Sequence, residues 1–223
     1  MEVPEVRRDC AYIALASLLP LVILRPFQDV PFVDDWVYAW SVENLRETGT
    51  LRILDLSASI NLAQTLWGWL FTLPFSFSFT ALRLSTWVLS LVCLCGLYVT
   101  LREFSVPRRE SLLGTATLGL YPSYFILSFT FMTDVPFLAA VVWSALCLGR
   151  AVHRNSDRWL IAGAALGCLA VSTRLLGVVL PGAYLATLLF HTGPWGRTPK
   201  RFLIACVPRA CCLGSCSCRN SMS

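Results

Sequence analysis

Charged residues are scarce in this sequence. Of its 223 residues only 14% are charged and 56% are hydrophobic, whereas about 25% of the residues of an ordinary soluble domain are charged. The chain has one lysine, no long basic tract, and no P-loop, GxGxxG or HExxH motif. These absences argue against a nucleic-acid partner and against nucleotide-driven or zincin chemistry.

Long apolar segments take the place of charge. Several approach or exceed the roughly 20 residues that cross a 30 Å hydrocarbon core. The sequence therefore predicts an all-α polytopic membrane protein with about six transmembrane helices. The first is the apolar run 10–24, which follows EVRRDC and precedes no small-residue cleavage site. We interpret it as a retained span with Arg7 and Arg8 on the cytoplasmic side.

Basic connectors fix the remaining spans through the positive-inside rule. The second to fourth spans are predicted at 80–101, 111–130 and 135–148. The stretch 159–190 is too long for one untilted crossing and breaks at VSTRLLG, so it counts as two short spans. Under this topology 11 basic residues lie inside and five lie outside, namely Arg25, Arg46, Arg52, Arg83 and Arg174.

The loop after the first span is predicted to be the acidic outer surface. Its segment 58–74 resembles an interfacial helix, because it carries polar and indole groups. These residues are Asn61, Gln64, Thr65, Trp67 and Trp69. The same loop holds six carboxylates, at Asp29, Asp34, Asp35, Glu43, Glu47 and Asp55.

Asp34 and Asp35 are adjacent acids in VPFVDDWVYAW. Carboxylates at a membrane surface can act as a general base toward a hydroxyl or help to bind a cation. The alternative is that one of them caps a helix that begins near Trp36, since Asp is among the best N-cap residues.

Asp134 lies between two apolar spans in SFTFMTDVPFLAA. An acid so close to hydrocarbon is costly and is a functional candidate, although it could also cap the fourth span. The topology places it on the same face as Asp34 and Asp35. Arg83 and Arg174 are predicted on that face too, where each could snorkel to the interface or bind an anionic lipid phosphate.

Ten cysteines divide into two groups. Cys10, Cys93, Cys95, Cys147 and Cys168 fall within or at the ends of apolar segments and are expected to pack as small hydrophobes. The other five crowd the end in ACVPRACCLGSCSCRNSMS without zinc-ligand spacing. We therefore divide the chain into a transmembrane part, 1–201, and a region 202–223 in which a further span starts and then runs into an atypical tail.

Taken in order, these segments resemble the N-terminal half of the polyprenyl-phosphate-dependent glycosyltransferases of the GT-C membrane fold. This class includes the protein O-mannosyltransferases and the lipid A aminoarabinose transferase. The resemblance covers about residues 10–190, which is part of a typical family member. It rests on the DD motif after the first span, NLAQTLWGWLF, ALRLSTWVLSL, MTDVPF and AVSTRLLGVVLP.

The resemblance implies a sugar donor linked to undecaprenyl or dolichyl phosphate and an acceptor hydroxyl on a protein, lipid or glycan outside the cytoplasm. It implies an inverting single displacement in which Asp34 or Asp35 is the catalytic base and Asp134 a supporting active-site residue. Arg83 and Arg174 would bind the donor phosphate. Some relatives use a divalent metal and others do not, so the resemblance leaves a cofactor open.

A non-catalytic polytopic protein, either a transporter or an assembly partner, is the alternative. Transport would place acids or broken helices near the bilayer midplane, whereas the acids here map to an outer surface. The near absence of lysine beside many arginines indicates a GC-rich genome. A bacterial inner membrane is therefore the favoured location, with the endoplasmic reticulum membrane as the alternative.

Overall fold

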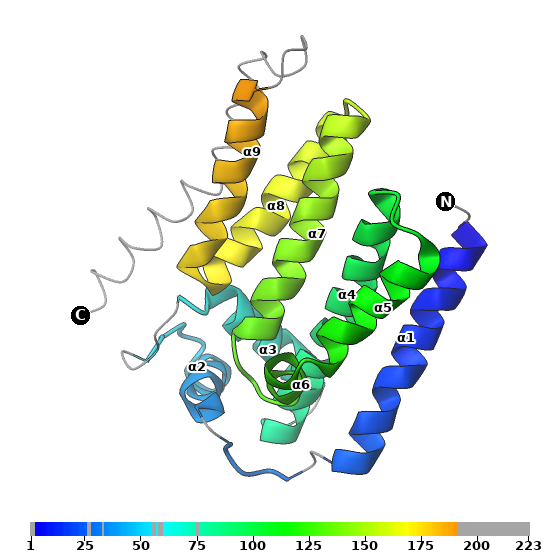
Figure 1. The fold of residues 1–223 in the computed structure, drawn as a ribbon. Helices are drawn as coiled ribbons and strands as arrows, with labels where there is room; N and C mark the ends of the chain where they lie inside the picture. The colour runs from blue at the N-terminus through cyan, green and yellow to red at the C-terminus, as the bar shows by residue number, and fades with distance from the viewer. Residues whose placement is uncertain are drawn as a thin grey trace.

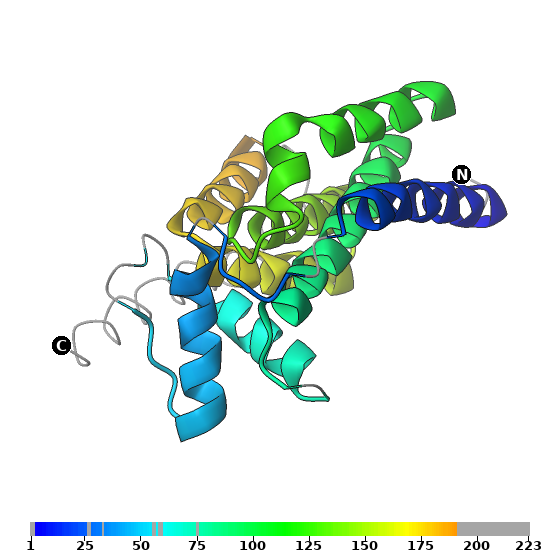
Figure 2. The same cartoon turned by 90° about the horizontal axis from the view of Figure 1, so that it is seen from below.

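The structure is a bundle of helices. The computed structural model describes residues 3–25, 28–32, 34–54, 57, 60–74 and 76–190, and these contain helices and loops but no strand. Figures 1 and 2 show long helices side by side with the shorter α2 and α3 gathered at one end. The elements are α1 (Val3–Leu24), α2 (Asp35–Thr48), α3 (Leu62–Thr72), α4 (Phe79–Glu103), α5 (Arg108–Leu120), α6 (Pro122–Leu127), α7 (Asp134–His153), α8 (Asp157–Thr173), the 3-10 turn η1 (Leu175–Val178) and α9 (Val179–Phe190).

Two helices, α4 and α7, are long and apolar enough to cross a membrane within the part of the chain that the structure describes. They run in the same direction and touch along their length, because Trp143 donates its indole N–H to the carbonyl of Val92 at 2.9 Å and Arg150 pairs with Glu103 at 2.7 Å. These partners are 51 and 47 residues apart. The same offset places Arg83 of α4 level with residues 130–134, at the start of α7.

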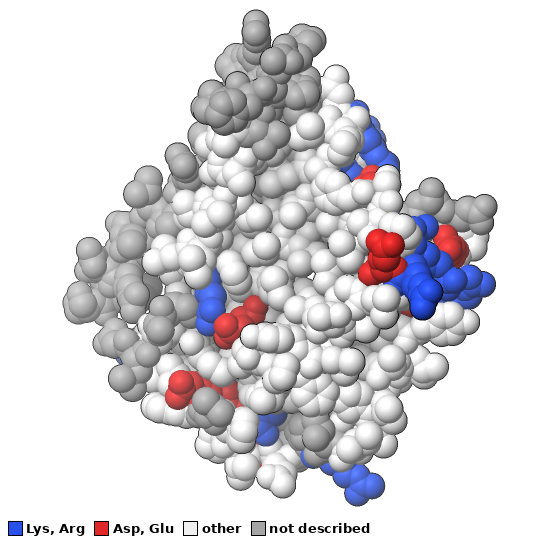
Figure 3. All heavy atoms as spheres, viewed as in Figure 1, with Lys and Arg blue, Asp and Glu red and all other residues white. Residues whose placement is uncertain are grey.

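The bundle has two polar ends. We call the end where α4 and α7 begin the loop end, since it carries α2, α3 and the segment 28–32. The other is the arginine end, where Arg102, Arg108 and Arg150 lie. Charged side chains gather toward these ends, and the surface between them is largely uncharged in Figure 3.

An apolar stripe covers the outside of α1. Leu15, Leu19, Val22 and Ile23 are each at least 63% exposed, an arrangement that suits contact with lipid rather than water. The other face of α1 lies on α4, where Trp87 donates its indole N–H to the carbonyl of Ser17 at 3.3 Å.

The predicted third span, 111–130, is two helices rather than one. Proline lacks an N–H group and disfavours the helical conformation in the residue before it. Tyr121 accordingly adopts φ −63° and ψ 122°, so that α5 ends at Leu120 and α6 begins at Pro122. The predicted break within 159–190 is confirmed: α8 ends at Thr173, Arg174 is extended, and α9 follows η1.

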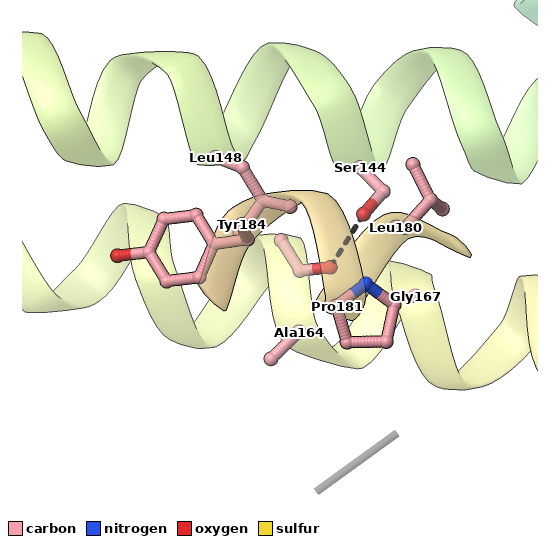
Figure 4. Close-up of a pocket in the computed structure, with 8 residues that line it drawn as sticks. Ser144, Leu148, Ala164, Gly167, Leu180, Pro181 and Tyr184 are labelled. Atoms are coloured by element: carbon pink, nitrogen blue, oxygen red, sulfur yellow. Dashed lines mark hydrogen bonds between the residues drawn. The ribbon is translucent and has the colours of Figure 1, made fainter. Parts of the chain in front are cut away.

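Close packing joins α7 to α8. A Cβ atom at Gly163 would lie 2.7 Å from the Leu148 side chain, and the Ser144 hydroxyl donates to the Gly163 carbonyl at 2.8 Å. A shallow pocket lies where α9 meets this pair, between Gly167 and Pro181 (Figure 4). No charged side chain lines this pocket, so it is not part of the charged clusters at either end.

The cysteines of the first group behave as expected for small packing residues. Cys93 and Cys147 are buried, Cys10, Cys95 and Cys168 are half-buried, and all five are free thiols. The five cysteines of the tail lie outside the described residues, as do the predicted seventh span and the basic segment that contains Lys200.

Candidate functional site

An apolar platform brings the predicted site segments together at the loop end. It consists of Tyr38, Ala39 and Val42 from α2, Leu82 from α4, and Phe131 just ahead of α7. Each of these residues is at most 6% exposed. Burial of this platform fixes the start of α2 beside the start of α4 and the turn that leads to Asp134. Acids far apart in the chain thereby come to one end of the bundle.

Asp35 and Arg83 form a buried ion pair on this platform. Asp35 Oδ2 accepts from Arg83 Nη2 at 2.9 Å and from Nε at 3.2 Å, and the two side chains are 0% and 6% exposed. Asp35 Oδ1 accepts from the backbone N–H of Phe32 at 2.7 Å. Both oxygens of Asp35 are therefore engaged.

Arg83 also ties down the segment that leads into α2. Its Nη1 donates to the Gln28 carbonyl at 2.7 Å and its Nη2 to the Val30 carbonyl. With the two bonds to Asp35, four of its five N–H groups have partners. The side chain therefore acts as a hub between α4, α2 and the loop.

Asp34 differs from its neighbour. It stands at the N-cap position of α2, yet its side chain makes no capping hydrogen bond, and it is exposed. The capping alternative is therefore right about the position but not about the bond. Among the three predicted active-site acids, Asp35 and Asp134 are held in ion pairs, whereas Asp34 makes no ion pair with any residue that the structure describes.

Asp134 and Arg174 form the second ion pair. Arg174 Nη1 and Nη2 meet the two carboxylate oxygens at 2.8 and 2.9 Å, and Nε donates to the Thr133 hydroxyl at 2.8 Å. This fork geometry suits Arg and carboxylate. Asp134 lies in the first turn of α7, which has Thr133 at its N-cap position. The pair is about one-third exposed, with 29% for Arg174 and 32% for Asp134.

Asp29 has a separate role at the start of α4. Its Oδ1 accepts from the Phe79 N–H at 2.6 Å and from the Ser78 hydroxyl at 3.0 Å, so it caps α4 together with Ser78. Asp55 lies outside the described residues. Within those residues no group of three or more His, Cys, Asp or Glu could hold a metal ion.

The polar residues of the segment 58–74 turn inward. Asn61, Gln64 and Thr65 were expected to meet water at an interface, but they are at most 1% exposed. They lie three and four residues apart, on the face of α3 that packs against the bundle. Trp67 donates its indole N–H to the Ser85 carbonyl at 3.3 Å, so it contacts α4.

The arginine end holds charge clusters that sequence patterning did not single out. Asp9 is fully buried and accepts from Arg108 at 2.6 and 2.7 Å and from the Tyr98 hydroxyl. The Arg108 guanidinium lowers the pKa of Asp9 to about 2. Glu103 pairs with Arg150 at 2.7 Å. The signal available in the sequence was the positive-inside pattern, which locates the arginines without their partners.

A sequence profile of the dolichyl-phosphate-mannose-protein mannosyltransferase family matches residues 65–213, about two thirds of the chain. The chain belongs to this family. Its members are membrane glycosyltransferases of the GT-C fold that use polyprenyl-phosphate-linked sugars, so the resemblance seen in the sequence is confirmed at the level of the family. No curated protein and no solved structure matches the chain significantly.

Family membership and the apolar helices α4 and α7 together indicate a membrane protein. The matched segment contains the Asp134–Arg174 pair and Arg83, whereas Asp34 and Asp35 precede it. The platform described above connects the two regions.

Proposed function

We propose that this protein transfers a sugar from a polyprenyl-phosphate donor to a hydroxyl group of an acceptor at the loop end, on the non-cytoplasmic face of the membrane. Asp34 is the catalytic base. The observation that carries this assignment is the contrast between Asp34, which is exposed and forms no ion pair with a described residue, and the paired acids Asp35 and Asp134.

The reaction is a single displacement. The acceptor hydroxyl gives its proton to the Asp34 carboxylate as its oxygen forms a bond to the anomeric carbon. The bond between that carbon and the phosphate oxygen breaks, and the electron pair leaves with the lipid phosphate. The sugar arrives with inverted configuration, since attack and departure occur on opposite faces.

Arg174 is the better placed of the two arginines to meet the leaving phosphate. Its pair with Asp134 and its bond to Thr133 use three of its five N–H groups, and the side chain is 29% exposed. A guanidinium stabilises the charge that develops on the phosphate. Arg83 and Asp35 are buried, so in this proposal they position the Asp34 loop.

The placement of acids also bears on the transport alternative. The described carboxylates of α4, α7 and α8 lie at helix ends, at Glu103, Asp134 and Asp157. A coupling site would place such groups near the middle of the bundle. We place six spans through α1, α4, α5–α6, α7, α8 and α9, with the arginine end in the cytoplasm and a bacterial inner membrane as the favoured location.

The test is the Asp34→Asn variant in proteoliposomes supplied with radiolabelled dolichyl-phosphate mannose and an acceptor extract. Loss of a general base lowers the transfer rate by about 10²- to 10⁴-fold. Binding of the lipid and the melting temperature should stay close to those of the unmodified chain, because the side chain is exposed and makes no cap. Glu47→Gln is the matched control, since it neutralises an exposed acid of the same helix. Unchanged transfer by Asp34→Asn would remove the base assignment.

A further inference from the structure

Four buried polar side chains at the loop end have no hydrogen-bond partner. They are Ser41 of α2, Asn61 at the N-cap position of α3, and Gln64 and Thr65 within α3. Each is at most 1% exposed. Buried polar groups are nearly always hydrogen-bonded, so an unpaired group calls for an explanation. Here the unpaired hydroxyls and amides are concentrated in one part of the molecule.

These side chains converge by helix geometry. Asn61, Gln64, Thr65 and Gly68 follow the i, i+3, i+4, i+7 pattern of one helix face. A Cβ atom at Gly68 would lie 2.6 Å from the Phe131 side chain and 3.0 Å from the Leu82 and Val42 side chains. This face therefore packs against the apolar platform, in which Val42 is the residue next to Ser41. The unpaired groups therefore lie where α3 packs against the platform and in the neighbouring part of α2.

The same contact lies close to the proposed base. Ser41 and Asp34 are seven residues apart, which puts them on nearly the same side of α2 and about 10 Å apart along its axis. A sugar that is bound at the polar groups would thus lie at the same end of the bundle as Asp34, about two helical turns from it along α2.

The chemistry of the four side chains selects the ligand. Amide and hydroxyl groups both donate and accept hydrogen bonds and carry no charge. A phosphate is matched by arginine or lysine, and a prenyl chain has no polar atoms. A sugar ring presents several hydroxyl groups, each of which is both donor and acceptor. We propose that Ser41, Asn61, Gln64 and Thr65 form the binding site for the sugar of the lipid-linked donor.

This inference rests on the proposed function, because it assumes a lipid-linked sugar. Binding requires α2 and α3 to part, and the described residues of their connection, 50–54, 57, 60 and 61, form neither helix nor strand. The sugar does not have to displace a protein hydrogen bond at these groups, since their polar atoms have no hydrogen-bond partner in the protein. The sugar therefore gains hydrogen bonds at groups that are already desolvated.

The test compares Thr65→Val with Thr72→Val. Both residues are buried threonines on the same face of α3, but the Thr72 hydroxyl donates to the Gly68 carbonyl at 2.9 Å, whereas that of Thr65 has no partner. Gln64→Leu is the second variant. Binding of dolichyl-phosphate mannose and of sugar-free dolichyl phosphate to the full chain is measured in proteoliposomes, together with the melting temperature.

We expect Gln64→Leu and Thr65→Val to weaken binding of the mannose-bearing lipid about tenfold, which corresponds to one or two lost hydrogen bonds. Binding of the sugar-free lipid should not change, and the melting temperature should not fall, because each change removes an unsatisfied buried polar group. Thr72→Val should leave the affinity for both lipids unchanged.

Two results would overturn the inference. The first is unchanged preference for the mannose-bearing lipid together with a lower melting temperature, which would mean that structural water satisfies the amides. The second is equal affinity of the unmodified chain for the two lipids, which would remove sugar recognition but keep the donor class. If the unmodified chain binds neither lipid, the proposed function fails as well.

Discussion

Replacement of Asp35 by Asn tests whether the Asp35–Arg83 pair is structural. The change leaves a guanidinium that is 6% exposed without its counter-charge, and breaking a buried pair in this way costs about 3 to 5 kcal/mol. The Gln28 and Val30 carbonyls still accept from Arg83, and Asn retains one acceptor, so we expect the lower value of about 3 kcal/mol. For a chain of this size the melting temperature should fall by about 6 to 12 °C.

The assay is thermal unfolding in detergent, followed by tryptophan fluorescence, with Asp34→Asn as the matched variant of the neighbouring residue. A double variant, Asp35→Leu with Arg83→Met, should recover more than half of the loss, because a buried pair can be replaced by apolar side chains at little cost and water can reach the exposed carbonyls of the loop. If Asp35→Asn melts within about 2 °C of the unmodified chain, the pair does not hold the loop and the distinction between Asp34 and Asp35 loses its basis.

Three further changes test the bundle. Gly163→Ala should lower the free energy of unfolding by about 1 to 3 kcal/mol, since its Cβ would lie 2.7 Å from a leucine side chain of α7. At Gly119 the nearest atom would be 3.5 Å away, so Gly119→Ala should be neutral or stabilising. Chemical unfolding measures both variants. The pKa of Asp9 is lowered to about 2. Its contribution to the free energy of unfolding, at most about 2 kcal/mol, is therefore fully present above about pH 4 and is lost as the pH falls through 2. Asp9→Asn should flatten the acid limb of a curve of stability against pH. Cysteines placed at the exposed positions Thr48 and Arg158, in a background without other reactive thiols, should label from outside and from the cytoplasm respectively with an impermeant reagent, and the reverse pattern would invert the topology.

Hydropathy and length predicted the two long helices well. The spans expected at 80–101 and 135–148 are α4 (Phe79–Glu103) and α7 (Asp134–His153). The break at Pro122 was present in the sequence as a proline but was hidden by the continuous apolar run around it. An apolar run indicates that a segment is buried or lies in lipid, but it does not indicate that the segment is a single helix.

The site shows where a single sequence stops being informative. Asp34 and Asp35 have the same chemistry and are adjacent, so only packing decides that one is exposed and the other is enclosed by Arg83, which is 48 residues away in the chain. Gln64 was predicted to meet water because it is polar. Its burial depends on the helices that pack against α3, and no local pattern in 58–74 encodes them.

The ion pairs at the two ends of α4 set a length. Arg83 pairs with Asp35 near the first turn and Arg102 with Glu5 near the last, and these arginines are 19 residues apart, a rise of about 28 Å. That distance is close to the thickness of a bilayer's hydrocarbon layer, about 30 Å. In a thicker membrane, either one ion pair would enter the hydrocarbon layer or the bilayer would have to become thinner around the helix. In a thinner membrane, apolar residues between the two pairs would be exposed to water. Because each ångström of mismatch carries a cost, the spacing of these two arginines would favour a membrane whose hydrocarbon layer is about 28 Å thick.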